Sequence, residues 1–218
     1  MKTIDYLCKI LEKYQIRDSI KKAFCEIDRR FFVPNEYKDI AYEDVVIPLK
    51  EEVTISQPTL LAYMIDILNP KDGDKILEIG TGSGYSTAIL SYLVGKKGKI
   101  ISMEIDDFAY NYAKEKINQL IKSEKIYNNI SIIKGDGTLG YPKESPYDKI
   151  IVHTALPMIP NPLVWQLKNI GVIVAPVGRH YDQKLILAKK IYGKLQKEEK
   201  IPVIFVPSRG KFGFYSTK

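Results

Sequence analysis

The sequence reads ILEIGTGSGY from Ile76 to Tyr85. Its first residues have the length and apolar character of a buried strand, and the three glycines that follow favour a tight turn that opens a helix. Glycine lets the backbone approach a ligand without the clash of a Cβ atom. In a doubly wound α/β sheet, ligands bind beside such a turn, at the carboxyl ends of the strands. The segment therefore predicts a ligand site after a central strand.

Short apolar strands alternate with longer amphipathic segments from Asp74 onward. This order predicts a parallel sheet with helices on both faces and right-handed crossovers. Residues 184–192 and 201–207 read instead as two strands separated by a charged turn, which predicts an antiparallel hairpin at one sheet edge. Strands are expected at 75–79, 99–103, 130–133, 149–152 and 171–176, and helices at 85–93, 108–121 and 161–167.

The first part of the chain has a different pattern. Residues 3–27 carry apolar positions at helical spacing, which predicts two short helices. Residues 30–48 are aromatic and irregular, which indicates a loop-rich segment packed against the core, and a helical pattern resumes from 58 to 68. We expect one domain over residues 1–218, with an N-terminal helical extension (1–70) and an α/β core that binds the ligand (71–218).

Composition excludes several classes of protein. The net charge is +7, but the lysines are scattered among glutamates, which indicates a mixed-charge surface rather than a nucleic-acid-binding arm. No apolar run approaches the roughly 18 residues of a membrane span, and we expect a soluble, cytoplasmic protein. The two cysteines, Cys8 and Cys25, lack the spacing of a metal or redox site. We expect them to be buried, reduced thiols, and we expect no metal.

The glycine spacing distinguishes between two cofactors. A dinucleotide-binding turn has the spacing Gly-x-Gly-x-x-Gly, with a helix N-terminus that faces a pyrophosphate. Here the glycines are Gly80, Gly82 and Gly84, followed by Tyr85. Glu78 would place a negative charge near the ligand, which disfavours phosphates and favours a cationic amino-acid group. The motif therefore indicates S-adenosylmethionine rather than NAD.

Two further segments follow predicted strands. Glu104 lies 20 residues after Gly84, at a strand end where a carboxylate can accept hydrogen bonds from both ribose hydroxyls. Residues 135–137 read Gly-Asp-Gly after the third strand, where the Asp136 side chain or backbone amides could reach the adenine edge. Such turns are also common as purely structural features. Their order at successive strand ends favours a cofactor site.

These residues resemble motif I and its followers in class I methyltransferases, and the whole chain is similar to the protein-L-isoaspartate O-methyltransferase family. The resemblance implies a doubly wound, mostly parallel, Rossmann-like α/β fold with an antiparallel C-terminal edge hairpin and an N-terminal helical extension. The TISQP segment is the most specific, because it lies upstream of motif I and has no role in the generic fold. The segments that carry the resemblance are RFFVP (30–34), AYED (41–44), TISQP (54–58), 77–85, GDG (135–137) and FVP (205–207).

The family pattern implies roles for individual residues. Ser56 would be the active-site residue between the methyl donor and the substrate carboxylate. Thr54 and Ile55 would line the same part of the site. A second interpretation makes Ser56 the N-cap of the helix that begins near Pro58, and the two roles are compatible. Cofactor contacts are implied for the methionine portion (Glu78, Gly80, Gly82), the ribose (Glu104), the adenine (Asp136, Gly137) and the glycine loop itself (Thr81, Gly84).

The resemblance implies transfer of a methyl group to the free carboxylate of L-isoaspartyl residues in damaged proteins, which initiates their repair. The expected partners are isoaspartyl proteins and peptides, with no stable nucleic-acid or membrane partner. The chain departs from the family in three places: the glycine-poor 48–53 (PLKEEV), HTALP at 153–157 where small residues are usual, and Ser208-Arg209 near the tail. The charged residues 50–52 lie where a substrate peptide is expected to run.

Two other functions fit parts of the pattern. An RNA base methyltransferase would share the fold and the basic charge, but residues 153–157 lack the Asn/Asp-Pro-Pro-aromatic motif that grips a flipped base. A non-catalytic S-adenosylmethionine-binding protein would fit the change at 50–52. His153 could act as a base for a different acceptor, or it could pack beside the cofactor as a structural residue.

Overall fold

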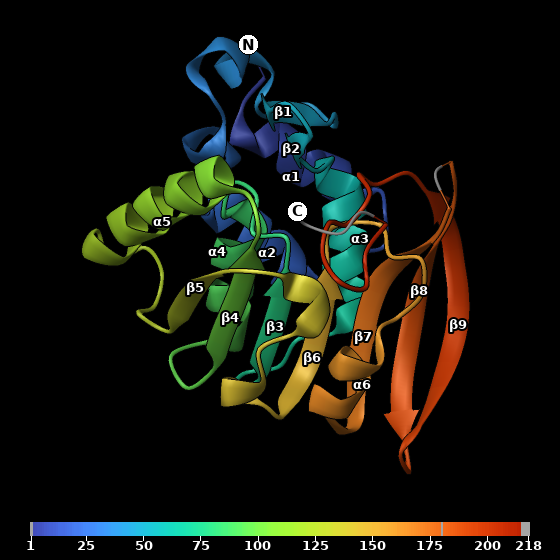
Figure 1. The fold of residues 1–218 in the computed structure, drawn as a ribbon. Coiled ribbons are helices and arrows are strands. Elements are labelled where there is room, and N and C mark those ends of the chain that lie inside the picture. Colours follow the sequence, from blue (N-terminus) through green and yellow to red (C-terminus); the bar gives the residue numbers. More distant parts are fainter. Residues whose placement is uncertain (1, 180, 215–218) are drawn as a thin grey trace.

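The computed structural model of the chain describes residues 2–179 and 181–214. Within them, seven strands form a central sheet in the order β5-β4-β3-β6-β7-β8-β9 (Figure 1). The first five strands in this order are parallel, and β8 and β9 continue the sheet as an antiparallel hairpin. The strands are β3 (Lys75–Ile79), β4 (Lys99–Glu104), β5 (Ile130–Lys134), β6 (Tyr147–Val152), β7 (Leu167–Arg179), β8 (Asp182–Ile191) and β9 (Lys194–Val203).

Alternate residues of the strands point to opposite faces of the sheet, and the two faces are covered unequally. Ile76 and Ile100 belong to a large buried cluster that includes residues of the five longer helices, whereas Leu77 and Ile101 belong to a smaller cluster with α6. Figure 1 shows α6 in front of the sheet and α2 and α4 behind it. The helices are α1 (Ile4–Glu12), α2 (Asp18–Glu26), α3 (Pro58–Leu68), α4 (Tyr85–Val94), α5 (Asp107–Lys122) and α6 (Asn161–Gln166).

The predicted fold class is confirmed, and each predicted helix and parallel strand is present within a few residues of its expected ends. Helices were expected on both faces of the sheet, and none was predicted between β5 and β6. That connection holds two short 3-10 helices, η3 (Gly137–Leu139) and η4 (Pro142–Glu144). Its Gly and Pro residues disfavour a longer helix there.

The tail hairpin exists, but its predicted boundaries are wrong. The charged residues 194–200 are part of β9 rather than a turn, and the turn is Tyr192-Gly193. An edge strand can carry many charged side chains, because they discourage pairing with other chains. Residues 205–207, predicted as strand, leave the hairpin and run beside Ala155, whose N–H donates to Val206 O at 2.8 Å.

The irregular segment 30–48 contains more structure than its sequence indicates. It begins with two 3-10 helices, η1 (Arg29–Phe32) and η2 (Asn35–Ile40). A small hairpin follows, formed by β1 (Ile47–Lys50) and β2 (Val53–Ile55) and separate from the main sheet. No strand was expected there, because Pro48 and the charged residues 50–52 interrupt the apolar pattern.

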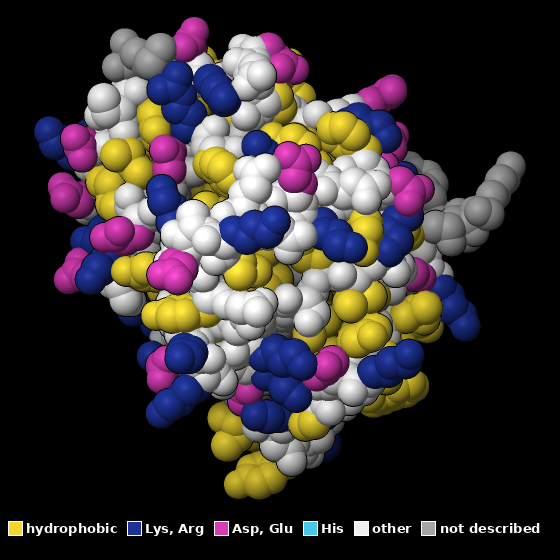
Figure 2. Space-filling view, turned by 90° about the vertical axis from the view of Figure 1, so that its left-hand side faces the viewer, with side chains coloured by type: hydrophobic (Ala, Val, Ile, Leu, Met, Phe, Trp, Pro, Cys, Tyr) yellow, Lys and Arg dark blue, Asp and Glu magenta, His cyan; other side chains and the backbone are white. Residues whose placement is uncertain are grey.

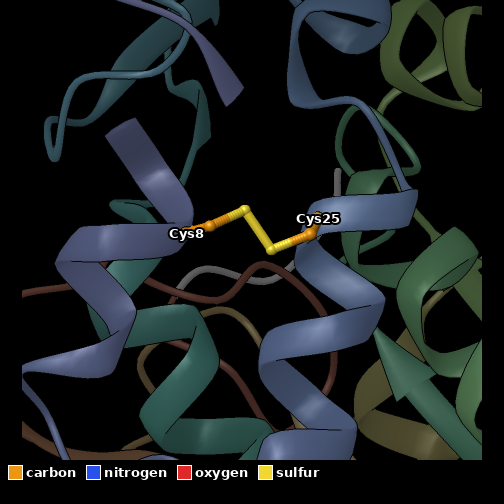
Figure 3. The surroundings of a disulfide bond; sticks show 2 residues. All are labelled: Cys8 and Cys25. Carbon is orange, nitrogen blue, oxygen red and sulfur yellow. A yellow bond between two sulfur atoms is a disulfide. The ribbon is translucent and has the colours of Figure 1, made fainter. Parts of the chain in front are cut away.

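The two cysteines form a disulfide between α1 and α2, so the prediction of reduced thiols is wrong (Figure 3). Both residues are half-buried rather than buried. The two helices pack side by side and bring the Cα atoms to 5.9 Å, within the range that a disulfide spans. Their separation of 17 residues gave no indication of this pairing, because it depends on how two helices pack.

We expect the Cys8–Cys25 bond to stabilise the N-terminal helices against unfolding. Closing a loop of this length restricts the unfolded chain, an effect of about 3 kcal/mol. The double variant Cys8→Ser/Cys25→Ser should therefore have a lower free energy of unfolding than the oxidised wild type in urea titrations. The reduced wild type should match the variant, and equal stability of the oxidised and reduced wild type would contradict the prediction.

Candidate functional site

A cavity of about 410 Å³ opens at the carboxyl ends of β3, β4 and β6. Its size is within the range of small-molecule sites. The cavity wall comes from segments far apart in the sequence: the β1–β2 hairpin and the start of α3, the glycine loop, the end of β4, the start of η3, residues 153–154 after β6, and residues 204–209. The glycine loop from which the ligand site was predicted therefore forms part of the wall of a cavity.

The glycine loop connects β3 to α4 with a left-handed backbone. Gly80, Gly82 and Gly84 have φ angles of 88°, 56° and 86°, which side chains with a Cβ atom rarely adopt. Gly80 and Gly82 line the cavity. Gly84 does not, and an added Cβ there would lie 3.3 Å from the Ile117 side chain of α5. Its role is to let α4 start and pack closely against α5.

Glu104 is buried at the end of β4 and lines the cavity. Its Oε2 accepts a hydrogen bond from the Gly82 N–H at 2.9 Å. Its Oε1 accepts from the N–H groups of Ile105 (2.8 Å) and Asp106 (2.9 Å). Because a carboxylate has about four acceptor positions, capacity remains for hydroxyl donors of a ligand. The carboxylate thus fixes the glycine loop and presents negative charge to the cavity.

Glu78 lies behind the loop, fully buried, and does not line the cavity. Its Oε2 accepts from Thr87 Oγ1 at 2.5 Å and from Ser102 Oγ at 2.6 Å. Thr81 Oγ1 is 2.6 Å from Ser102 Oγ and extends this network. The third contact of Glu78 joins its Oε1 to His153 Nε2 at 3.2 Å. Glu78 and Thr81 therefore hold the loop from beneath.

These contacts determine the charge of Glu78. Burial raises the pKa of its carboxyl, but the hydrogen bonds from His153, Ser102 and Thr87 help to outweigh burial, and the pKa lies below the usual range. A carboxyl whose pKa falls on folding stabilises the fold above its unfolded-state pKa, and this contribution is lost as pH falls through the folded-state value. Glu78 is therefore ionised at neutral pH.

We expect Glu78→Gln to lower stability by about 1–3 kcal/mol, because an amide cannot accept all of these hydrogen bonds in a buried position. The loss should shrink at acid pH, where the wild-type carboxyl also becomes protonated. Urea titrations at pH 7 and at a series of pH values below the ordinary glutamate pKa of about 4.3 measure it, with the exposed Glu12→Gln as the matched control. Equal stability of Glu78→Gln and wild type at pH 7 would show that the network is dispensable.

Asp136 holds the tail of the chain rather than lining the cavity. Its Oδ1 accepts from the Thr138 N–H (2.8 Å) and Oγ1 (2.6 Å) and caps η3. Its Oδ2 accepts from the Lys211 N–H at 2.7 Å. Gly210 fits against the same carboxylate, since a Cβ there would lie 2.1 Å from Oδ1. The neighbouring Gly137 does line the cavity.

Ser56 lines the cavity at the entrance to α3, and its side chain caps no helix. The N-cap position belongs to Gln57, and the capping carboxylate comes from Asp44. Asp44 Oδ1 accepts from the Thr59 N–H at 2.9 Å, and its Oδ2 accepts from Thr59 Oγ1 and Gln57 Nε2 at 2.7 Å each. The interpretation of Ser56 as a helix cap is therefore wrong, because a residue 12 positions upstream performs that function.

Arg29 fixes the backbone around Ser56 from inside the core. It is fully buried, and burial lowers its pKa to about 10, with the charges of Tyr85 and Asp44 acting in the opposite direction. At neutral pH it remains cationic. Its guanidinium donates to four carbonyl oxygens, those of Ala41 (2.8 Å), Glu43 (3.1 Å), Val45 (2.9 Å) and Ser56 (3.1 Å). The residue was missed in the sequence, where it precedes the RFFVP motif.

The β1–β2 hairpin forms part of the cavity wall. Thr54 is exposed and lines the cavity, whereas Ile55 is buried in the core and does not. Of the charged residues that distinguish this chain, Glu52 lines the cavity, with φ 61° in the turn. The Lys50 ammonium lies 3.5 Å from the carboxylate of Asp106, directed toward the start of α5. Of the charged residues 50–52, only Glu52 therefore lines the cavity.

Six of the eleven residues predicted for the site line one cavity, and five do not line it. The six come from both halves of the chain. Residues expected to contact the substrate therefore line the same cavity as residues expected to contact the cofactor. The sequence also missed the wall formed by residues 204–209. The lining residues among the predicted set are Thr54, Ser56, Gly80, Gly82, Glu104 and Gly137, and the others are Ile55, Glu78, Thr81, Gly84 and Asp136.

Comparison with known proteins identifies relatives over nearly the whole chain. Residues 2–212 match the family model of protein-L-isoaspartate(D-aspartate) O-methyltransferase. The chain is 40% identical over 211 residues to protein-L-isoaspartate O-methyltransferase 2 of Archaeoglobus fulgidus, covering 96% of this chain and 94% of that protein. It is 42% identical over 198 residues to the protein-L-isoaspartate O-methyltransferase of Methanococcus aeolicus, covering 90% and 88%.

Solved structures agree with these sequence relatives. A protein-L-isoaspartate O-methyltransferase structure that is 33% identical superimposes with a TM-score of 0.88, covering 97% of this chain and 67% of that one. A Plasmodium falciparum chain solved in complex with S-adenosyl-L-homocysteine shares the fold at 24% identity and a TM-score of 0.80. The extent of these matches and the site geometry lead to one conclusion: the chain belongs to the protein-L-isoaspartate O-methyltransferase family.

Proposed function

We propose that this protein transfers a methyl group from S-adenosylmethionine to the free carboxylate of L-isoaspartyl residues in damaged proteins and so initiates their repair. Family membership supports the activity. The observation that carries it to individual residues is the shared cavity, which Ser56 and Thr54 line from one side and Gly80, Gly82 and Glu104 from the other. Donor and acceptor sites would then meet in one cavity.

The cavity fits the proposed cofactor. The left-handed glycine loop leaves space that a Cβ atom would otherwise fill, and Glu104 is a carboxylate with unused acceptor positions beside it. We assign the methionine portion to the loop at Gly80 and Gly82, the ribose to Glu104 and the adenine to the Gly137 side. Asp136, Glu78, Thr81 and Gly84 would support these contacts through the network and the packing that hold the loop and the tail.

The chemistry requires little of the protein beyond positioning. S-adenosylmethionine supplies a methyl group that is already activated on a sulfonium. The acceptor carboxylate is ionised at neutral pH and needs no general base. Ser56 would orient that carboxylate, Arg29 would fix the Ser56 backbone, and the apolar walls at Leu60 and Phe205 would exclude water. Alignment of reacting groups contributes roughly 7–11 kcal/mol in favourable intramolecular models.

RNA methylation is less well supported. Nucleic-acid binding depends on several Lys or Arg contacts to phosphates. Among the described residues that line the cavity, Arg209 is the one Lys or Arg. Figure 2 shows that basic side chains on the face of α5 and β5 are interspersed with acidic and apolar ones. We therefore propose protein and peptide partners, without a stable nucleic-acid or membrane partner.

The organisation of the chain supports this assignment. We propose one domain over residues 1–218, in which residues 1–70 form the substrate side and residues 71–218 bind the cofactor. Leu7 and Phe24 share a buried cluster with Ile76 of the sheet, so both parts contribute to one core. The described residues contain no helix that is long and apolar enough to span a membrane. A cytoplasmic location is part of the proposal.

Transfer of a labelled methyl group distinguishes the alternatives. Wild-type protein is incubated with radiolabelled S-adenosylmethionine and an isoaspartyl peptide, the same peptide with normal aspartate, or tRNA. We expect base-labile label on the isoaspartyl peptide alone. Label on tRNA would favour the RNA enzyme, and cofactor binding without any transfer would favour a non-catalytic protein.

A further inference from the structure

His153 occupies the cavity floor directly beside the glycine loop. Its side chain is nearly buried, the residue lines the cavity, and a Cβ added to Gly80 would lie 3.4 Å from the His153 Cβ. Nε2 is 3.2 Å from Glu78 Oε1 and 3.0 Å from Ser86 Oγ. No described residue forms a hydrogen bond with the other ring nitrogen, Nδ1. One nitrogen is therefore committed to the protein, and the other is free.

The partner of Nε2 fixes the tautomer of the ring. Glu78 is ionised and can only accept hydrogen bonds, so Nε2 carries a proton. In the neutral ring, Nδ1 is then an unprotonated acceptor. The carboxylate beneath the ring also increases the negative charge on that nitrogen, as occurs when a carboxylate orients a metal-binding histidine. The buried carboxylate of Glu78 can thus make His153 a stronger hydrogen-bond acceptor toward the cavity.

We propose that Nδ1 of His153 accepts a hydrogen bond from the α-ammonium group of the cofactor's methionine portion. This inference rests on the proposed cofactor site, in which that portion lies at Gly80. The other carboxylates that line the cavity are less suited to this contact, because Glu104 is engaged by three backbone N–H groups and Glu52 lies on an exposed turn. Glu78 would then interact with the cationic end of the ligand through His153.

The test measures binding rather than turnover. S-adenosylhomocysteine and its desamino analogue, in which hydrogen replaces the α-ammonium, differ in the group that His153 is proposed to bind. Calorimetry on the wild-type chain should show weaker binding of the desamino analogue by roughly 10- to 100-fold, the usual effect of a hydrogen bond to a charged group. Equal affinities in the wild type would overturn the proposal without any mutation.

His153→Gln provides the matched variant. The Gln amide can donate to Glu78 and accept from Ser86 Oγ, but it places no acceptor where Nδ1 lies. We expect the variant to lose roughly 10- to 100-fold in affinity for S-adenosylhomocysteine and to bind the desamino analogue like the wild type. Equal losses for both ligands would show that His153 only supports the loop, and no loss for either would remove it from the site.

The same data separate this inference from the proposed function. A wild-type chain that binds S-adenosylhomocysteine but does not methylate isoaspartyl peptides would overturn the proposed substrate and leave the role of His153 intact. A folded wild-type chain that binds neither ligand would overturn the cofactor assignment and this inference together. His153→Ala, checked for folding by its melting temperature, should repeat the ligand-selective loss of His153→Gln.

Discussion

Glu104→Ala should weaken S-adenosylhomocysteine binding by about 100-fold or more. The variant loses a charged acceptor for two ribose hydroxyls, each worth roughly 1.5–3 kcal/mol, and about 1.4 kcal/mol corresponds to a factor of ten. It also frees the Gly82 N–H that donates to Glu104 Oε2 at 2.9 Å, so the loop itself becomes less ordered. Calorimetry measures the affinity, and Glu199→Ala, on the exposed edge strand β9, is the matched control.

The two contributions can be separated with a second ligand. A 2′,3′-dideoxy analogue of the same nucleoside lacks the hydroxyls that Glu104 is proposed to bind. Wild-type protein should discriminate strongly against it, and Glu104→Ala should bind both ligands about equally. A folded variant that still discriminates would remove the ribose contact and leave Glu104 as a support of the loop.

The parts of the fold that were predictable depend on local patterns. The strand, glycine turn and helix from Lys75 to Val94 follow from apolar periodicity and from glycines at left-handed positions, both of which can be read within a dozen residues. Glu104 was predictable for a related reason, since parallel strands place their carboxyl ends at one sheet edge. Its position at the end of β4 was sufficient to place it beside the loop.

The parts that were not predictable depend on contacts between distant segments. Asp136 follows a strand as expected, but its carboxylate accepts from Lys211, 75 residues away. Asp44 caps a helix that begins at Pro58, a contact that no local capping pattern indicates. The Cys8–Cys25 pair depends on the packing of two helices in the same way. A sequence pattern predicts which residues lie near a strand end, but it does not predict which of their atoms are already engaged.

Glu78 illustrates how such engagement changes a functional argument. Its position before the first glycine predicted a carboxylate near the ligand, yet its oxygens accept from Thr87 and Ser102 and contact His153. The residue that reaches the cavity is His153, which the sequence left open between a base and a structural role. The sequence predicted the charge of Glu78 near the ligand, but only the fold identifies His153 as the residue through which that charge is proposed to act.

Ser56→Ala should reduce methyl transfer to an isoaspartyl peptide by on the order of 100-fold while leaving cofactor affinity nearly unchanged. Loss of a group that positions a reactant can have an effect of that size. Ser56→Ala should change the rate without changing the stability, because the Ser56 side chain caps no helix and Asp44 supplies the cap of α3. The Ser56 variant should therefore melt at the wild-type temperature.

Asp44→Ala is the contrasting variant, since it should lower stability by about 0.5–2 kcal/mol through loss of the cap. Its effect on single-turnover rate, measured well below its melting temperature, should be much smaller than that of Ser56→Ala. Melting temperature, cofactor affinity and single-turnover rate are measured on both variants in the same buffer. If Ser56→Ala turned over isoaspartyl peptide as fast as the wild type, its hydroxyl would have no part in orienting the carboxylate. Ser56 would then be only a residue of the cavity wall.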